Sequence, residues 1–219
     1  MDEKKVLCSY CPRKNCYTGD VSQAPNFCPT VNKPEVMKEA MARLSEPENQ
    51  AMAQDVARSW KAKDRPTRIE RTVEYARLRG FKKLGLAFCA ALSKEAELLT
   101  NYLLNEEFEV ASVCCMCGAI SSDDIRLPEE DKVAPAGNRQ AMCNPITQAL
   151  VLNSENCDFN LVLGLCVGDD TLFVQHSEAP VTLLAAKDRD LAHNPLGALY
   201  TSHSGYSRLN TRRPKNKPE

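Results

Sequence analysis

The pattern of apolar and polar residues changes at about residue 80. After a cysteine-rich start, residues 33–79 contain no cysteine and are rich in Ala, Glu, Lys and Arg, and apolar residues such as Met52, Val56 and Trp60 recur at spacings of four. This period is typical of helices with one buried stripe, and Pro or Gly at the ends of such a segment marks helix boundaries. The segment therefore predicts three helices, at residues 34–44, 47–63 and 66–79.

From residue 82 onward, short apolar runs alternate with segments of helical period. Four of these runs are read as strands: KKLGLAFC, EVASVCCMCG, FNLVLGLCVG and APVTLLAAKD. Nearly continuous apolar strands that are joined by helices are typical of a parallel sheet covered on both faces. We predict an α/β fold with a four-stranded, or slightly larger, parallel sheet in the flavodoxin-like order 2-1-3-4.

The same change of pattern predicts how the chain is divided. We expect a cysteine-rich head at residues 1–32, a helical segment at 33–80 and the α/β domain at 81–205. The last residues, SRLNTRRPKNKPE, are polar, basic and contain proline, which is typical of a disordered tail. We place this tail at residues 206–219.

Composition narrows the classes of function. The chain has 219 residues, a net charge of -1 and 11 cysteines. Balanced charge argues against a general polyanion binder, so nucleic acid is not the expected partner. No apolar run approaches the roughly 18 residues of a membrane span, and the N-terminus has no apolar signal region. We expect a soluble, cytoplasmic protein, in which clustered cysteines serve as metal ligands or reactive thiols rather than as disulfides.

Four cysteines lie close together in the head. Cys8, Cys11, Cys16 and Cys28 have the spacing C-x2-C-x4-C-x11-C, and a proline directly follows the second and the fourth. Structural zinc sites commonly use two close ligand pairs, whereas an iron–sulfur cubane accepts four separate thiolates and often has a proline behind a ligand cysteine. The spacing favours a 4Fe–4S cluster, with zinc as the alternative.

Most of the other cysteines fall at the carboxyl ends of predicted strands. Cys89 ends the first strand, Cys115 and Cys117 end the second, Cys166 ends the third, and Cys143 precedes a helix start. The carboxyl ends of parallel strands share one edge, and ligands bind there at the point where the strand order reverses. We expect these five cysteines to line a crevice with enough thiolates for a second cluster.

Strand geometry limits which cysteines can meet. Cys157 precedes the third strand and Cys166 ends it, so the two lie up to roughly 30 Å apart and cannot share a site. Cys114 and Cys115 alternate along the second strand, so at most one of them faces the crevice. We interpret Cys157 as a small core or surface thiol.

Polar residues follow two of these strands. Asp169 and Asp170 fit the N-cap and first turn of the next helix. Lys187, Asp188 and Arg189 follow the fourth strand at the same edge of the sheet. They would hold an anionic substrate there or form a surface ion pair. His193 fits either a hydrogen-bonded structural histidine or a proton donor or ligand.

Two resemblances add to this interpretation. The C-x2-C-x4-C run with a more distant fourth cysteine resembles the small iron–sulfur module of corrinoid iron–sulfur proteins. Over nearly the whole chain, the segments CSYCPRKNCYTGD, MCNPITQA, NLVLGLCVGDDTLF, APVT and KDRDLAHNPLGALY resemble an uncharacterised cysteine-rich family of anaerobic bacteria and archaea that is described as metal-binding. This resemblance supplies no activity.

The second resemblance implies roles for most of the cysteines. It implies metal binding by the four head cysteines, Cys8 to Cys28, and supports a functional role for Cys89, Cys115, Cys143 and Cys166. The chain departs from the family at Cys117, where the family often has another residue.

Two classes of function follow from these observations. The first is a redox protein in which a cluster in the head exchanges electrons with a second cluster or a thiol centre in the crevice. Its partner would be a redox protein or a small molecule, and an enzymatic form would be an iron–sulfur oxidoreductase. The second is a binding protein in which zinc folds the head and the crevice thiols carry a metal, a persulfide or another soft ligand.

Overall fold

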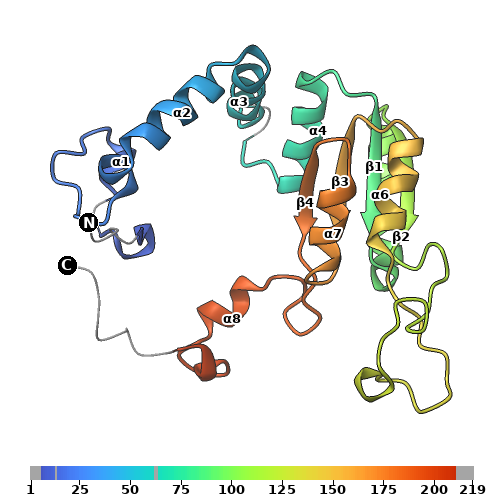
Figure 1. Ribbon diagram of the computed structural model, residues 1–219. Helices are drawn as coiled ribbons and strands as arrows, with labels where there is room; N and C mark the ends of the chain where they lie inside the picture. Colours follow the sequence, from blue (N-terminus) through green and yellow to red (C-terminus); the bar gives the residue numbers. More distant parts are fainter. Residues whose placement is uncertain (1–5, 13, 62–63, 211–219) are drawn as a thin grey trace. The chain divides into compact units, whose positions relative to one another are not determined.

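The computed structural model describes residues 6–12, 14–61 and 64–210, and its ribbon is drawn in Figure 1. The chain divides into two compact units. The first runs up to Ala57, and the second covers Arg58–Leu209. The head cysteines lie in the first unit and the remaining seven cysteines in the second.

The second unit is built on a four-stranded sheet. Its strands are β1 (Lys83–Phe88), β2 (Glu109–Cys114), β3 (Phe159–Leu163) and β4 (Val181–Ala185). Their order is β2-β1-β3-β4, and every pairing is parallel. The predicted α/β fold with strand order 2-1-3-4 is confirmed.

Helices cover both faces of this sheet, and Figure 1 shows α6 and α7 together on one of them. On one face, α4 (Arg68–Leu78) and α5 (Ser93–Asn105) contribute to a first core, and on the other, α6 (Pro145–Ser154) and α7 (Asp169–His176) contribute to a second. The first core contains Val73, Ala76, Leu84, Leu86, Ala96, Leu99, Leu103, Phe108, Phe159 and Leu161. The second contains Ala87, Cys89, Val113, Cys115, Ala149, Leu152, Cys157, Val162, Leu165 and Phe173. Alternate residues of β1 enter different cores because successive strand side chains point to opposite faces.

Local sequence sets the ends of α4. Thr67 caps the helix by accepting a hydrogen bond from the Glu70 backbone, and the Glu70 carboxylate accepts one from the Thr67 backbone. This capping box fixes the start one residue after Thr67. Beyond the helix, Gly80 has a φ of 72°, the left-handed conformation that glycine adopts most easily. The predicted helix at residues 66–79 is thus observed with a slightly later start.

The regular structure described in the first unit is helical. The 3₁₀ helices η1 (Cys8–Tyr10) and η2 (Asn15–Tyr17) are followed by α1 (Pro29–Asn32) and α2 (Pro34–Leu44). The helix predicted at residues 34–44 coincides with α2. Helix α3 (Pro47–Ser59) ends before the predicted residue 63, and residues 62 and 63 lie outside the described part of the chain.

The remaining elements of the second unit are short. They are η3 (Ala90–Leu92), η4 (Glu129–Asp131), α8 (Leu196–Tyr200) and η5 (Ser207–Leu209). The tail predicted at residues 206–219 begins with η5, and from residue 211 it lies outside the described residues. Within the described ranges, no helix combines the length and the apolar character needed to cross a membrane.

Candidate functional site

The four head cysteines line one cavity. Cys8 lies in η1, Cys16 lies in η2, Cys11 follows η1, and Cys28 directly precedes α1. The cavity has a volume of about 480 Å³, and its other walls include the apolar side chains of Ala24, Pro25 and Phe27. Phe27 is buried, with 5% of its surface exposed. The spacing of the head cysteines therefore brings all four thiols around one mostly apolar space.

Two of these thiols receive hydrogen bonds from the backbone. The Lys14 N–H donates to Cys11 Sγ over 3.3 Å. Burial opposes ionisation of Cys28, but hydrogen bonds from the Thr30 side chain and from the backbone of Thr30 and Val31 outweigh it and lower the pKa of this thiol. Thiolates are the metal-binding form of cysteine, so the lowered pKa of Cys28 favours its ligating state.

The thiols share this cavity without forming a coordination sphere. Among the described residues, no three Cys, His, Asp or Glu side chains are arranged to hold a metal ion. The donor set nevertheless fits a thiolate-bound metal group, because four sulfur donors surround one cavity and cysteine is the usual ligand of iron–sulfur clusters and structural zinc. Binding would require the four sulfur atoms to move toward a common centre.

The second group of cysteines lies where β1 and β2 end. Phe88 and Cys114 are the last paired residues of the two strands, but the hydrogen bonds continue beyond them. The Cys115 N–H donates to the Phe88 carbonyl over 2.9 Å, and the Cys89 N–H donates to the Leu163 carbonyl over 3.1 Å. Cys89 and Cys115 are therefore neighbours on adjacent strand ends, and both side chains belong to the core beneath α6 and α7.

A long loop returns the chain to this point. After Cys115 the backbone runs out and comes back to Asn144, whose N–H donates to the Cys115 carbonyl over 2.8 Å. An antiparallel bridge between Ser121 and Ala141 closes the base of the loop. The Asn144 side chain then caps α6 by accepting from the Thr147 N–H over 3.0 Å. Cys143 is thereby placed beside Cys115.

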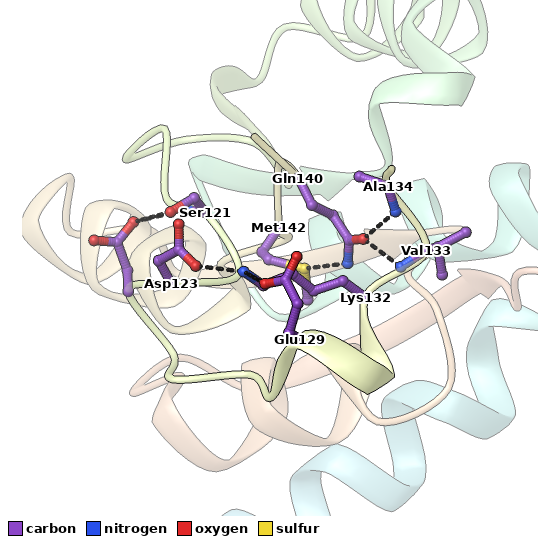
Figure 2. Close-up of polar contacts among 9 residues, drawn as sticks. Ser121, Asp123, Glu129, Lys132, Val133, Ala134, Gln140 and Met142 are labelled. Carbon is purple, nitrogen blue, oxygen red and sulfur yellow. Dashed lines mark hydrogen bonds and ion pairs between the residues drawn. The ribbon is translucent and has the colours of Figure 1, made fainter. Parts of the chain in front are cut away.

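Side-chain contacts hold the outer part of this loop, as Figure 2 shows. The Gln140 side-chain oxygen accepts hydrogen bonds from the Val133 and Ala134 N–H groups over 2.7 and 2.9 Å. Lys132 Nζ forms ion pairs with Asp123 and Glu129 over 2.7 and 2.6 Å, and its own side chain is only 12% exposed. These contacts give an otherwise irregular loop a defined path between its two cysteine-bearing ends.

Lys187 distinguishes Cys89 from its neighbours. Its Nζ donates to Cys89 Sγ over 3.2 Å, from the segment that follows β4. Burial opposes ionisation of Cys89, but the Ala91 N–H, the Lys187 ammonium and a hydrogen-bonding contact with Cys115 outweigh it, so the pKa of this thiol lies below its ordinary value. Cys89 is the thiol of this group that is favoured as a thiolate.

The neighbouring thiols are held in the protonated form. Burial raises the pKa of Cys115 even though the Ala90 N–H lies 3.4 Å from its sulfur. Burial also raises the pKa of Cys143, and so do contacts with Cys115 and Asp169. Cys89, Cys115 and Cys143 thus form a row of thiols in successive contact, with the Lys187 cation at one end and Asp169 at the other.

The other expected crevice cysteines lie around this row. Cys166 is partly exposed, and burial and nearby Asp169 raise its pKa. Cys117 packs at the margin of the same core. Cys114 is partly exposed, and its sulfur accepts from the Met116 N–H over 3.4 Å. Cys157 is buried just before β3, at the end of the strand opposite to Cys166.

The polar residues near the edge have mainly local partners. Asp169 and Asp170 open α7, and Asp170 Oδ1 accepts from the Gly168 and Thr171 N–H groups. His193 Nδ1 accepts from the Asp188 N–H over 3.1 Å and closes a turn after β4. This contact matches the interpretation of His193 as a hydrogen-bonded structural histidine.

Sequence reasoning missed Gln148. This residue of α6 is fully buried, and its Nε2 donates to the carbonyls of Val113 and Phe88 over 2.7 and 3.2 Å. It thereby connects the ends of β1 and β2, just before Cys89 and Cys115. The only signal in the sequence is a single amide within the otherwise apolar run ITQALVL.

Comparisons with known proteins place the chain in a family. A family model described as "Protein of unknown function (DUF1847)" matches residues 28–184. The chain is also 38% identical over 200 residues to the uncharacterized protein MJ0455 of Methanocaldococcus jannaschii, and the match covers 90% of this chain and 95% of the relative. No solved structure matches. The chain therefore belongs to the family described as Protein of unknown function (DUF1847).

Proposed function

We propose that this chain is an iron–sulfur redox protein in which Cys8, Cys11, Cys16 and Cys28 hold one 4Fe–4S cluster. The single observation that carries the proposal is the cavity of about 480 Å³ that all four thiols line. No sulfur donor of the second unit is needed for this site, so it is complete within the head.

The size of the cavity favours a cluster over a single zinc ion. Four Zn–S bonds of about 2.3 Å would draw the sulfurs to within about 4 Å of one another and leave little space between them. A cubane places four irons and four sulfides between its cysteine ligands and fills such a space. The uneven spacing of the four cysteines and the prolines behind Cys11 and Cys28 agree with this preference.

The residues of the head have two tasks in this proposal. A bound cluster would supply one-electron transfer. The Lys14 N–H, which donates to Cys11 Sγ, would stabilise the reduced form because hydrogen bonds to ligand sulfur offset added negative charge. Buried Phe27 would keep water and oxygen from one side of the cavity.

Anaerobic purification followed by iron, acid-labile sulfide and zinc analysis tests this function. We expect about four iron and four sulfide per chain, a broad visible absorption and an EPR signal on reduction. Zinc at one equivalent without sulfide would instead support a zinc-binding protein and remove the electron-transfer interpretation.

Single Cys→Ser variants locate the site. Cys11→Ser and Cys16→Ser are expected to lose most of the iron and the visible absorption. Cys157→Ser is the matched control because this buried cysteine lies in the other unit, and it should retain both. Equal iron in the Cys11→Ser variant and the control would contradict the assignment.

A further inference from the structure

We propose that Cys89 and Cys115 form a reactive dithiol that reduces the S–S bond of a small anionic polysulfide, with Cys89 as the attacking thiol and Cys115 as the resolving one. The reaction would take place at the sheet edge of the second unit, and it is separate from the cluster proposed for the head. It requires no metal.

The backbone places the two sulfurs within reach of a disulfide. Cys89 and Cys115 directly follow the paired residues Phe88 and Cys114 on adjacent parallel strands. Neighbouring strands lie about 4.8 Å apart, and disulfides join Cα atoms that are roughly 4.4–6.8 Å apart. Both side chains enter the same core, so they point to the same face of the sheet. A bond between them needs little movement of the backbone.

The surroundings assign different tasks to the two thiols. The Lys187 ammonium donates to Cys89 Sγ over 3.2 Å, whereas Cys115 Sγ lies near the Ala90 N–H at 3.4 Å. A positive charge beside a thiol favours the thiolate, which is the nucleophile in thiol–disulfide exchange. The lowered pKa of Cys89 and the raised pKa of Cys115 agree with an attacking and a protonated resolving thiol.

Exposure and charge define the class of substrate. Cys89 is 6% exposed and Cys115 is 1% exposed, so a protein disulfide or a bulky organic disulfide cannot bring its sulfur to the attacking thiol. Inorganic polysulfide is compact and can present a terminal sulfur. It is also anionic at neutral pH, and the Lys187 cation lies next to the sulfur that would attack.

Two steps complete the reaction. The Cys89 thiolate attacks the S–S bond of hydrogen disulfide, HS–S⁻, which forms the persulfide Cys89–S–S⁻ and releases HS⁻. The Cys115 sulfur then attacks the Cys89 sulfur of the persulfide, which forms the Cys89–Cys115 disulfide and releases a second HS⁻ that carries the proton from the Cys115 thiol. The dithiol loses two electrons, and the two sulfur atoms of the S–S bond leave as sulfide.

The test uses the full chain, reduced anaerobically, with inorganic tetrasulfide as the probe. We expect release of sulfide and, after digestion under non-reducing conditions, a cross-linked peptide that contains Cys89 and Cys115. In Cys115→Ser the resolving thiol is absent, so a persulfide on Cys89 should accumulate with the mass of one added sulfur atom. Cys89→Ser should give neither product. A bulky anionic disulfide, oxidised glutathione, should react far more slowly than tetrasulfide.

Matched controls separate this centre from the head and from other thiols. Cys157→Ser retains both reacting cysteines and should behave as the unmodified chain. The Cys11→Ser/Cys16→Ser double variant should lose the proposed cluster but keep the cross-link, so the two proposals fail independently. Cross-linking of the unmodified chain needs no variant, so it remains informative if a cysteine substitution prevents folding.

Three outcomes would overturn the proposal. A persulfide on Cys143 or Cys166 instead of Cys89 would assign the attack to another thiol. Iron and sulfide retained in the head double variant would mean that the sheet-edge cysteines hold a cluster. Sulfide release at the rate of the Cys89→Ser variant would mean that the dithiol does not react with polysulfide.

Discussion

The Gln148 side chain of α6 reaches across to β2 and donates to the Val113 carbonyl over 2.7 Å. The same nitrogen lies 3.2 Å from the Phe88 carbonyl of β1, and Gln148 is fully buried. One amide group therefore bridges the ends of the two strands that carry Cys89 and Cys115. The bridge involves the backbone of the two strands and neither of the thiols.

We predict that Gln148→Leu lowers the free energy of unfolding by about 1 kcal/mol. The substitution replaces the amide with an apolar side chain of similar size and removes the hydrogen bonds that Nε2 donates to the Val113 and Phe88 carbonyls. Both carbonyls keep their partners in the sheet, so the expected loss is that of a net hydrogen bond, about 1 kcal/mol. Urea unfolding measures the change. Leu150→Ala on the exposed side of α6 is the control, and we expect a change within about 0.5 kcal/mol. Equal stabilities of Gln148→Leu and the unmodified chain would show that the bridge contributes nothing.

Lys187→Gln should raise the pKa of Cys89. Burial raises the pKa of this thiol, whereas the Ala91 N–H and Lys187 lower it. Without the Lys187 ammonium, less opposes the effect of burial, and the pKa rises. The rate of alkylation follows the thiolate fraction, and each pKa unit changes that fraction about tenfold below the pKa. The measurement is the pH profile of iodoacetamide labelling at the Cys89 peptide.

The lowered pKa of Cys89 also makes the stability of the unmodified chain depend on pH. Since the folded-state pKa of Cys89 is lowered, its ionisation stabilises the fold above the ordinary thiol pKa, and this contribution is lost as the pH falls through the folded-state value. Lys187→Gln should reduce that dependence. Arg189→Gln is a matched control because the charge of Arg189 lowers the pKa of Cys166 and is not among the main influences on Cys89. Coinciding profiles of Lys187→Gln and the unmodified chain would rule out the assigned role of Lys187.

The sequence was sufficient to predict the parallel sheet and the edge at which Cys89 and Cys115 lie. The apolar runs that contain Leu84, Val113 and Val162 predict strands joined by helices, and Cys89 and Cys115 then fall at one edge, although β3 ends at Leu163 and not at the predicted Cys166. These predictions succeed because strand period and parallel connection are local or topological properties.

The contacts that give the thiols different properties could not be predicted in this way. Lys187 and Cys89 are separated by 98 positions, and they meet because β3 pairs with both β1 and β4. Cys143 lies beside Cys115 because the Ser121–Ala141 bridge closes a loop that has no periodic sequence pattern. Side-chain contacts of this kind depend on tertiary packing, which a pattern of apolar positions does not encode.

Phe27→Ala should shorten the lifetime of the proposed cluster in air. Phe27 is 5% exposed and forms part of the wall of the head cavity, so its removal opens a path for water and oxygen. We expect normal iron content after anaerobic purification but faster loss of visible absorption in air. Val31→Ala is the control because Val31 lies in α1 and is 50% exposed. Equal rates of loss for the two variants would argue against shielding by Phe27.

Gly85 gives the last prediction, because a side chain at this position would collide with Asn160. The two residues are paired across β1 and β3, and a Cβ at Gly85 would lie 1.9 Å from Asn160 Oδ1 and 2.9 Å from a methyl carbon of Leu152. Asn160 is fully buried, and its Nδ2 donates to Ser177 Oγ over 2.8 Å. Gly85→Ala would therefore displace the amide and break this hydrogen bond.

We expect Gly85→Ala to lower the free energy of unfolding by about 1–3 kcal/mol, as overpacking of a filled core does. Gly205→Ala is the matched control because a Cβ at Gly205 meets no atom within 4 Å, and its effect should stay within about 0.5 kcal/mol. Urea unfolding of both variants measures the difference. Since β1 carries Cys89 at its end, Gly85→Ala should also slow formation of the Cys89–Cys115 cross-link, and an unchanged rate together with unchanged stability would show that the strand tolerates the methyl group.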